Sequence, residues 1–346
     1  MRAPIVVSQG QCAVWEEPVG PAGVHLRERA IVEPPNGQVR VRVRAAGLNH
    51  LDVWVVTGAQ RVQPPRVIAA DGAGVVEASG SPDWTPGDEV ICYPVAACGV
   101  CTRCRVGQHV HCAQFAVLGE HSDGAACELV QVPSRNLYRK PATLNWDEAA
   151  ALPLAYLTAW RMLTTRAQLR QGETLLVVGG SGAVGTAAIL IGRHLGATVL
   201  ATSRDPDKRA ELVSLGASHT FSSTGFSRSV LEVTDAAGAD VVVDHVGAAT
   251  FDESLRSAAV GGRVVTCGAT TGVMSQVNLP RLFARHLSIL GSTTGNADEF
   301  GALVAAAGAG LRPVVAASYP MGQVQAALTA VQQGTQIGKV VLSCSS

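Results

Sequence analysis

The feature that most constrains the fold is a glycine-rich turn between an apolar run and a helix-forming stretch. Residues 175–178 are Leu-Leu-Val-Val, and they lead into the pattern Gly180-x-Gly182-x-x-Gly185. The pattern alone is weak evidence, but between a strand and a helix it is typical of a dinucleotide-binding turn. We expect Gly180 to make the turn, Gly182 to admit a pyrophosphate, and Gly185 to pack the helix against the strand. The phosphates would meet the positive helix N-terminus, which adds three predicted contacts: Ser181, Ala183 and Val184.

After residue 173 the chain alternates apolar runs with helix-forming stretches. The predicted strands are residues 174–178, 198–202, 240–244, 263–267 and 288–290, with helices such as 183–195 and 208–215 between them. This alternation predicts the α/β fold class, with a doubly wound parallel sheet and helices on both faces. Residues 175–192 are uncharged over nearly the length of a membrane span, but their glycines indicate a strand, a turn and a helix instead.

The first part of the chain is β-like and the last part returns to it. Val39–Arg44 alternates apolar and basic residues with period two, which is typical of a half-buried strand. Near residue 145 the period changes, and Asn145 with Glu148 has the spacing of a helix capping box. A helix at 323–332 and a strand at 338–342 close the chain. We therefore predict a discontinuous first domain, residues 1–156 and 297–346, with a nucleotide-binding domain inserted at 157–296.

Four of the nine cysteines form the pattern Cys98-x2-Cys101-x2-Cys104-x7-Cys112. Four thiolates about 2.3 Å from one ion suit tetrahedral Zn²⁺, and Gly99 and Gly107 allow the tight backbone of such a lobe. The pattern predicts one structural Zn²⁺ in a lobe near residues 94–115. An iron–sulfur cluster and disulfides are the alternatives; the first normally adds a Cys-Pro that is missing here, and the second does not suit a cytosolic chain.

Composition excludes several kinds of partner. The 27 basic residues balance the 27 acidic ones, so the chain lacks the basic excess of a nucleic-acid binder. Aromatic residues make up only 4%, too few for a base-stacking surface. We expect a globular, cytoplasmic protein that acts on a small-molecule substrate and binds neither nucleic acid nor membrane.

The choice of nicotinamide cofactor depends on the end of the second strand of the βαβ series. NAD enzymes place an acidic residue there to bind the ribose 2′-hydroxyl. In this chain the position carries Ser203, followed by Arg204, and both suit a 2′-phosphate. Lys208 adds a further positive charge, whereas Asp205 would serve NAD if the strand ran longer. The residues favour NADPH over NADH.

The glycine turn and the cysteine lobe, in this order, resemble the medium-chain dehydrogenase/reductase superfamily of zinc alcohol dehydrogenases and quinone oxidoreductases. Supporting segments are Ala46–Asp52, Pro86–Val90 and Gly338–Leu342. The resemblance implies a GroES-like β-barrel catalytic domain, a Rossmann domain, and an active site in the cleft between them. It also implies a homodimer formed through the edge strands of the Rossmann sheets. Thr158, by its position on the helix that enters the Rossmann domain, is expected to border the nicotinamide, and Lys339 is a further predicted cofactor contact.

The chain departs from the alcohol dehydrogenases at the catalytic zinc. The family's three ligand positions fall on Asn49, Ala70 and a residue near Leu154. Asparagine, alanine and leucine do not make a three-ligand zinc site with an open fourth position. We therefore expect no catalytic zinc of this type. A substitute site would have to come from His50, Asp52, Asp71, Glu120 or His121.

Asn49-x-x-Asp52 instead resembles the Asn-x-x-Asp of the zinc-independent quinone oxidoreductases, a branch that generally lacks the cysteine lobe. The predicted reaction is hydride transfer from NADPH to a quinone or an α,β-unsaturated carbonyl, in which conjugation spreads negative charge onto oxygen. The candidate catalytic residues are Asn49 as hydrogen-bond donor, His50 as proton donor or relay, and Asp52 as the group that orients the loop. Two alternatives stay open: an alcohol dehydrogenase with unconventional zinc ligands, and a non-catalytic NADPH-binding sensor or scaffold.

Overall fold

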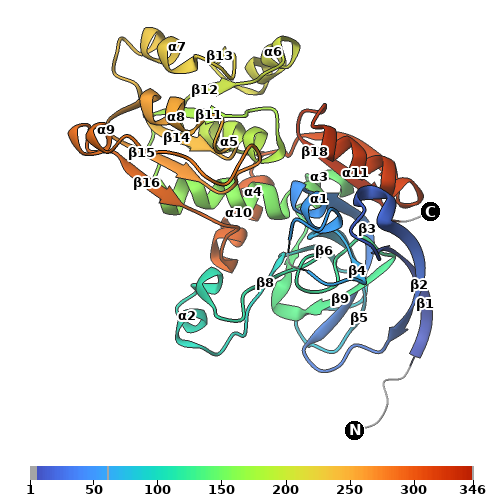
Figure 1. The fold of residues 1–346 in the computed structure, drawn as a ribbon. Coiled ribbons are helices and arrows are strands. Elements are labelled where there is room, and N and C mark those ends of the chain that lie inside the picture. The colour runs from blue at the N-terminus through green and yellow to red at the C-terminus, as the bar shows by residue number, and fades with distance from the viewer. Residues whose placement is uncertain (1–5, 61, 345–346) are drawn as a thin grey trace. The chain divides into compact units, whose positions relative to one another are not determined.

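The structure is a computed structural model, and it describes residues 6–60 and 62–344 (Figure 1). The chain forms two compact units. The first comprises Met1–Ala155 and Gly295–Ser346, and the second comprises Tyr156–Thr294. Each unit has its own sheets.

The second unit is built on one parallel sheet with the strand order β13-β12-β11-β14-β15-β16. Its strands are β11 (Thr174–Val178), β12 (Thr198–Thr202), β13 (His219–Phe221), β14 (Ala239–Asp244), β15 (Ala258–Thr266) and β16 (Ser288–Gly291). The chain starts in the middle at β11, runs outward to β13 and then returns to β14. The crevice where the order reverses, at the carboxyl ends of β11 and β14, is where such sheets bind ligands. The predicted doubly wound parallel sheet is confirmed.

Helices join the strands of this sheet. They are α5 (Ala183–His194), α6 (Pro206–Leu215), α7 (Phe226–Val233), α8 (Phe251–Ser257) and α9 (Leu279–Ala284). Helix α5 contacts α6, and α7 contacts α8. Connections between parallel strands are right-handed, so the connections on the two sides of β11 cover opposite faces of the sheet. The uncharged run at 175–192 forms β11, the glycine turn and most of α5. Among the described residues, no helix has the length and apolar character needed to cross a membrane.

The first unit contains β-sheets that are mainly antiparallel. A sheet with the order β2-β1-β4 comprises β1 (Val6–Trp15), β2 (Val24–Val32) and β4 (Arg66–Val67). A larger sheet has the order β10-β6-β5-β3-β18-β17, with β9 also pairing with β3. Its strands are β3 (Gln38–Leu48), β5 (Asp71–Ser79), β6 (Glu89–Cys92), β9 (Leu129–Pro133), β10 (Leu137–Arg139), β17 (Val315–Pro320) and β18 (Lys339–Ser343). A short pair, β7 (Val95–Ala96) and β8 (Ala116–Val117), flanks the cysteine lobe.

The C-terminal part of the chain belongs to the first unit. Strand β18 pairs with β3, so residues 339–343 lie beside residues 45–48. Helix α11 (Val324–Gln333) packs on β18, and α10 (Ala297–Gly308) begins where the chain re-enters this unit. The remaining helices are α1 (His50–Val56), α2 (Thr102–Arg105), α3 (Trp146–Ala151) and α4 (Pro153–Arg161).

The predicted capping box at Asn145 is confirmed. The Asn145 side chain accepts a hydrogen bond from the Glu148 backbone N–H at 2.9 Å, and Glu148 accepts one in return from the Asn145 N–H, also at 2.9 Å. Helix α3 therefore starts at Trp146. It ends before Pro153, because proline lacks the N–H that would continue the helix, and Pro153 instead opens α4.

Candidate functional site

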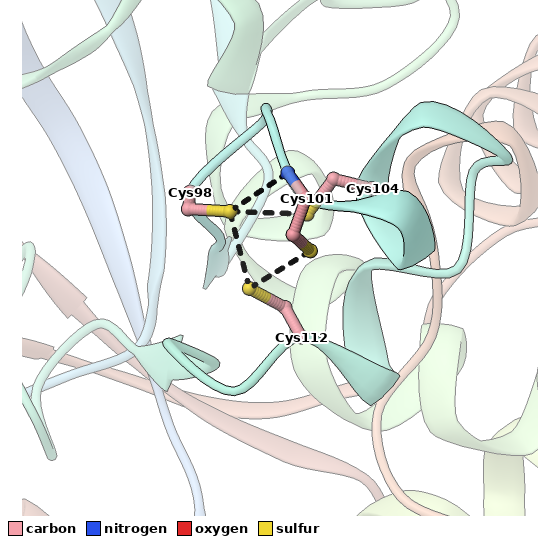
Figure 2. A group of neighbouring side chains, drawn as sticks. All are labelled: Cys98, Cys101, Cys104 and Cys112. Atoms are coloured by element: carbon pink, nitrogen blue, oxygen red, sulfur yellow. Dashed lines mark hydrogen bonds between the residues drawn. The ribbon is translucent and has the colours of Figure 1, made fainter.

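The cysteine lobe brings four sulfur atoms together. The Sγ atom of Cys98 lies 3.8 Å from that of Cys104 and 3.6 Å from that of Cys112, and Cys101 and Cys112 are 3.9 Å apart (Figure 2). A tetrahedral site with zinc–sulfur bonds of about 2.3 Å has sulfur–sulfur edges of about 3.8 Å. A disulfide bond of about 2.05 Å is much shorter, and an iron–sulfur cage needs its thiolates farther apart. The four cysteines therefore fit one Zn²⁺.

Backbone N–H groups donate hydrogen bonds to two of these sulfurs. The Cys101 N–H donates to Cys98 Sγ at 3.4 Å, and the Gln114 N–H donates to Cys112 Sγ at 3.3 Å. Such bonds to backbone N–H groups, that of Val100 foremost, lower the pKa of the Cys98 thiol from 9.0 to about 6. Gly99 and Gly107 have φ angles of 77° and 75°, so the predicted need for glycine in the lobe is confirmed.

A buried network of charged and amide groups lies where β3, β5 and β18 meet. The ammonium of Lys339 donates to three oxygens, Leu48 O, Asn49 Oδ1 and Asp71 Oδ2, each at 2.7 Å. Asp71 Oδ2 also accepts from Asn49 Nδ2 at 2.9 Å, and Asp71 Oδ1 accepts from the Leu154 N–H at 2.8 Å. Lys339 and Asp71 are fully buried.

This network occupies the ammonium of Lys339 and fixes the side chain of Asn49. All three N–H groups of Lys339 are directed at protein oxygens, so we assign Lys339 to the network instead of to the predicted cofactor contact. Asn49 is held on both sides of its amide, and its remaining Nδ2–H makes only a long contact of 3.5 Å to Gly47 O. Gly47 itself has no room for a side chain, because a Cβ would lie 2.3 Å from Ala150 O.

Asp52 holds the loop that carries Asn49. Its Oδ2 accepts from the Asn49 backbone N–H at 2.8 Å, and its Oδ1 accepts from the Ala69 N–H at 2.9 Å. Ala69 adopts a left-handed φ of 73°, which is costly for a residue with a side chain and is fixed here by this bond. Burial raises the pKa of Asp52 from 3.8 to about 6, against the two backbone hydrogen bonds and Lys339, which lower it. Asp52 thus fixes the backbone at Asn49 and at Ala69.

His50 follows Asn49 as the first residue of α1 and is exposed. Its ring packs edge-on against Trp54, with ring centroids 5.2 Å apart. Partial burial lowers the pKa of the imidazole below its usual 6.5, so His50 is mainly neutral at pH 7. A neutral imidazole can accept a proton at one nitrogen and donate one from the other.

Two positions of the alcohol dehydrogenase zinc site lie in an apolar cluster. Ala70 and Leu154 pack together with Val117, and the side chains of Leu51 and Phe115 lie against them. Ala70 is 1% exposed and Leu154 is 8% exposed, so the space is closed by hydrocarbon. This cluster offers no atom that binds zinc.

The substitute ligands considered from the sequence do not converge. Among residues 6–60 and 62–344, the four-cysteine lobe is the only group in which three or more His, Cys, Asp or Glu side chains could hold a metal. Asp52 and Asp71 are occupied as described above. Glu120 lies 3.5 Å from His121 Nδ1, which also accepts from the Val117 N–H at 3.2 Å.

The glycine turn lies between β11 and α5, and the glycine with the left-handed backbone conformation differs from the one expected. The left-handed residue is Gly179, with φ 79°, whereas Gly180 was expected to make the turn. Gly180 is needed for packing, because a Cβ there would lie 2.8 Å from Leu212 Cδ1. Gly185 admits no side chain either, since its Cβ would lie 2.2 Å from Gly179 O. Gly182 is the N-cap residue of α5, and no side chain caps this helix.

The end of β12 decides whether Asp205 lies at the end of that strand, where an acidic residue would bind the ribose of NAD. Strand β12 ends at Thr202, so Ser203 is the first residue beyond it. Asp205 caps α6, because its carboxylate accepts from the Asp207 N–H at 2.9 Å. Ser203 is buried at 3% exposure, and the next residue, Arg204, is exposed. Lys208 lies on α6 and is half-buried, and Thr158 lies on α4 and is buried.

Sequence reasoning missed the ion pair between Asp71 and Lys339. Asp71 was considered only as a substitute metal ligand. The two residues are 268 positions apart, so no local pattern connects them. The one available signal was a charged residue at the start of each of the two strands, next to apolar residues, since buried charges are normally paired.

Two protein-family models match this chain, one in its N-terminal part and one in its C-terminal part. A family model described as "Alcohol dehydrogenase GroES-like domain" matches residues 35–142. A second, described as "Zinc-binding dehydrogenase", matches residues 183–309. The first match lies in the unit that holds the cysteine lobe, and the second begins at the helix after the glycine turn.

Individual relatives match nearly the whole chain. An acryloyl-coenzyme A reductase of Metallosphaera sedula is 31% identical over 326 residues, which are 93% of this chain and 96% of the relative. The quinone oxidoreductase of Homo sapiens is 27% identical over 338 residues, 93% of this chain and 94% of the relative. Among solved structures, an NAD-dependent alcohol dehydrogenase has a TM-score of 0.93 and 38% identity, with 97% and 100% of the two chains covered. A 2-octenoyl-CoA carboxylase reductase in complex with NADP and 2-octenoyl-CoA has a TM-score of 0.90 and 26% identity, with 98% and 88% covered.

Proposed function

The chain belongs to the medium-chain dehydrogenase/reductase superfamily, and we propose that it is an NADPH-dependent reductase of conjugated acceptors that works without a catalytic zinc. It is an NAD(P)H-dependent oxidoreductase by the names of its relatives. The observation that carries the finer proposal is the apolar cluster of Ala70, Leu154 and Val117, which contains two of the three zinc-ligand positions.

The acceptor follows from that cluster. Reducing an isolated carbonyl, or oxidising an alcohol, benefits from a Lewis acid that stabilises charge on oxygen. A quinone or an α,β-unsaturated carbonyl needs less help, because conjugation carries the charge from the attacked carbon to the oxygen. Relatives named for acryloyl-coenzyme A and quinone support this class of substrate.

The chain's own residues then bind and orient the reactants, while the nicotinamide cofactor, when bound, supplies the hydride. We assign the weakly engaged Nδ2–H of Asn49 to the acceptor oxygen, since its other amide contacts fix the donor in place. Asp52 holds the backbone of that loop. His50, neutral and exposed, passes a proton from water to the reduced product.

The cofactor assignment is NADPH. We propose that the backbone N–H groups at the start of α5, from Ser181 to Gly185, hold the pyrophosphate. Ser203 and Arg204 hold the 2′-phosphate, with Lys208 adding positive charge, and Asp205 does not compete because it caps α6. The structure of a relative bound to NADP supports this choice.

We also propose that Cys98, Cys101, Cys104 and Cys112 bind one structural Zn²⁺. Binding of the ion stabilises the folded lobe, and the lobe in turn is anchored to α10. The Val110 N–H donates to Asn296 Oδ1 at 3.1 Å. Zinc thiolates and free cysteines suit a reducing compartment, so we place the protein in the cytoplasm.

Alcohol dehydrogenase activity is the second candidate, because a solved NAD-dependent alcohol dehydrogenase is 38% identical to the chain. The two candidates separate in one assay that follows the absorbance of the reduced nicotinamide. We expect turnover with NADPH and acryloyl-CoA, an enone or a quinone, and slower turnover with alcohols and either oxidised cofactor. Faster alcohol oxidation would overturn the proposal. Tight NADPH binding with no turnover of any acceptor would favour the non-catalytic sensor.

We also propose a homodimer formed through β16, the edge strand of the parallel sheet. An unpaired edge can add a strand from a second copy. Exposed apolar residues lie on and before this strand: Val273, Met274, Leu279, Phe283 and Ile289. Light scattering at micromolar concentration should give a dimeric mass for the wild type and a lower mass for the double variant Phe283→Glu/Ile289→Lys. A monomeric wild type would contradict this interface.

A further inference from the structure

Two buried cysteines outside the four-cysteine lobe face each other across neighbouring strands. Cys12 lies in β1 and Cys127 lies just before β9, and the two form an antiparallel bridge. The bridge is flanked by hydrogen bonds from the Ala13 N–H to Ala126 O at 2.8 Å and from the Glu128 N–H to Gln11 O at 2.9 Å. These hydrogen bonds join the neighbours of the two cysteines and not the cysteines to each other. The pair therefore occupies a non-hydrogen-bonded position, where opposite side chains approach most closely.

This position has the geometry of a disulfide. Residues opposite each other at a non-hydrogen-bonded position have Cα atoms about 4.5 Å apart, and their side chains leave the sheet on the same face. A disulfide spans Cα distances of about 4.4–6.8 Å. The bond between Cys12 and Cys127 therefore needs side-chain rotation and little movement of the backbone.

The two thiols also differ in the way that a reactive pair requires. A side-chain hydrogen bond from Cys127 lowers the pKa of the Cys12 thiol from its usual 9.0, and the charge of Arg29 acts in the same direction. Burial and the carboxylates of Asp123 and Glu128 oppose this shift. The same contact, together with burial, raises the pKa of Cys127. Cys12 is therefore the nucleophile and Cys127 the resolving thiol.

We propose that Cys12 and Cys127 are a modification site that hydrogen peroxide converts to a reversible disulfide. The Cys12 thiolate attacks one oxygen of hydrogen peroxide, and an S–O bond forms while the O–O bond breaks. Hydroxide is the leaving group, and Cys12 becomes a sulfenic acid. The Cys127 sulfur then attacks the Cys12 sulfur, the S–O bond breaks, and water leaves with the proton of Cys127. Two electrons pass from the sulfur pair to peroxide, and a dithiol returns them.

The bond would cross-link the first unit around its functional residues. The closed loop runs from residue 12 to residue 127 and contains Asn49, Asp52, Asp71 and the cysteine lobe. A cross-link over a loop of this length restricts the unfolded chain strongly. Because Cys12 is only 7% exposed and Cys127 only 2%, the reaction should be slow compared with that of a surface thiol.

The test is peptide mapping of the zinc-loaded protein after peroxide treatment, with remaining thiols alkylated after denaturation. A protease that cleaves before aspartate cuts at Asp123, and so separates Cys127 from Cys112. We expect one cross-linked peptide pair that joins Cys12 to Cys127, with zinc retained, and its loss on treatment with dithiothreitol. The melting temperature of the oxidised protein should rise by about 5 °C or more.

Matched variants decide between this pair and its neighbour. Cys344 is another buried thiol of the same core, and burial raises its pKa to about 12. Cys344→Ser should leave the cross-link and the thermal shift intact, whereas Cys12→Ala should abolish both. Three outcomes would each overturn the proposal. Cys12 and Cys127 could both remain open to alkylation after oxidation, either of them could form a bond to Cys344, or the cross-link could form only when zinc is released. The wild-type map alone is sufficient if Cys12→Ala does not fold.

Discussion

Lys339→Met is the substitution that tests the buried network most sharply. It removes an ammonium from three oxygens at 2.7 Å and leaves the Asp71 carboxylate fully buried, with only the N–H groups of Leu154 and Asn49 as partners. Removing one member of a buried ion pair costs about 3–5 kcal/mol, because the other charge stays buried and uncompensated. We expect a loss of about 4 kcal/mol in the free energy of unfolding.

The second variant of this experiment is Asp71→Asn/Lys339→Met. Asparagine is neutral and keeps an oxygen for the Leu154 N–H, so the double variant should be more stable than Lys339→Met alone by about 2 kcal/mol. Arg27→Gln is the control, since the Arg27–Glu16 pair is exposed and worth less than about 1 kcal/mol.

Urea unfolding followed by tryptophan fluorescence suits this comparison. Four of the five tryptophans belong to the first unit, namely Trp15, Trp54, Trp84 and Trp146. All variants should be compared with zinc loaded, so that metal loss does not enter the difference. If Lys339→Met unfolds at the same urea concentration as Arg27→Gln, or if the double variant is less stable than Lys339→Met, the network does not hold its charges as described.

Three further predictions follow from the site. The folded pKa of Asp52, about 6, lies above its unfolded value of 3.8, so folding takes up a proton between these values. Relative to Asp52→Asn, wild-type unfolding free energy should therefore rise by about 3 kcal/mol as pH falls from 6.5 to 3.5, and equal slopes in urea titrations would refute this. Ser203→Asp should raise the KM for NADPH about 10- to 100-fold and lower that for NADH, measured by initial rates; an unchanged ratio would remove Ser203 from the 2′-phosphate site. A chelator should lower the calorimetric melting temperature of the wild type and of Cys267→Ser alike but have no effect on Cys98→Ser, whereas a shift that persists in Cys98→Ser would place the metal elsewhere.

The sequence predicted most of the parallel sheet, because all its strands except β13 contain an apolar run. Residues 174–178 and 198–202 match β11 and β12 in both bounds. Strand β13 was not predicted, since His219-Thr220-Phe221 is short and mixed in polarity, and only its pairing with β12 makes it a strand. Strand β15 starts at Ala258, earlier than predicted, because Gly261 and Gly262 interrupt the apolar run without ending the strand.

The candidate site was predictable where its residues are close in sequence. The four cysteines span fifteen positions, so their spacing alone indicated one ion, and the sulfur distances agree with that prediction. The division of roles between Gly179 and Gly180 depends on where β11 ends, which periodicity does not define to one residue. The contacts of Lys339 with Asn49 and Asp71 depend on the pairing of β18 with β3, which local sequence does not encode.

The central claim is that the chain carries a structural zinc and no catalytic zinc, and the amount of zinc per chain tests it most directly. Elemental analysis of zinc-loaded, gel-filtered wild type should give one zinc per chain, held by the four-cysteine lobe. Two zinc ions per chain would contradict the account, because a metal would then occupy a site that the apolar cluster of Ala70, Val117 and Leu154 was argued to exclude.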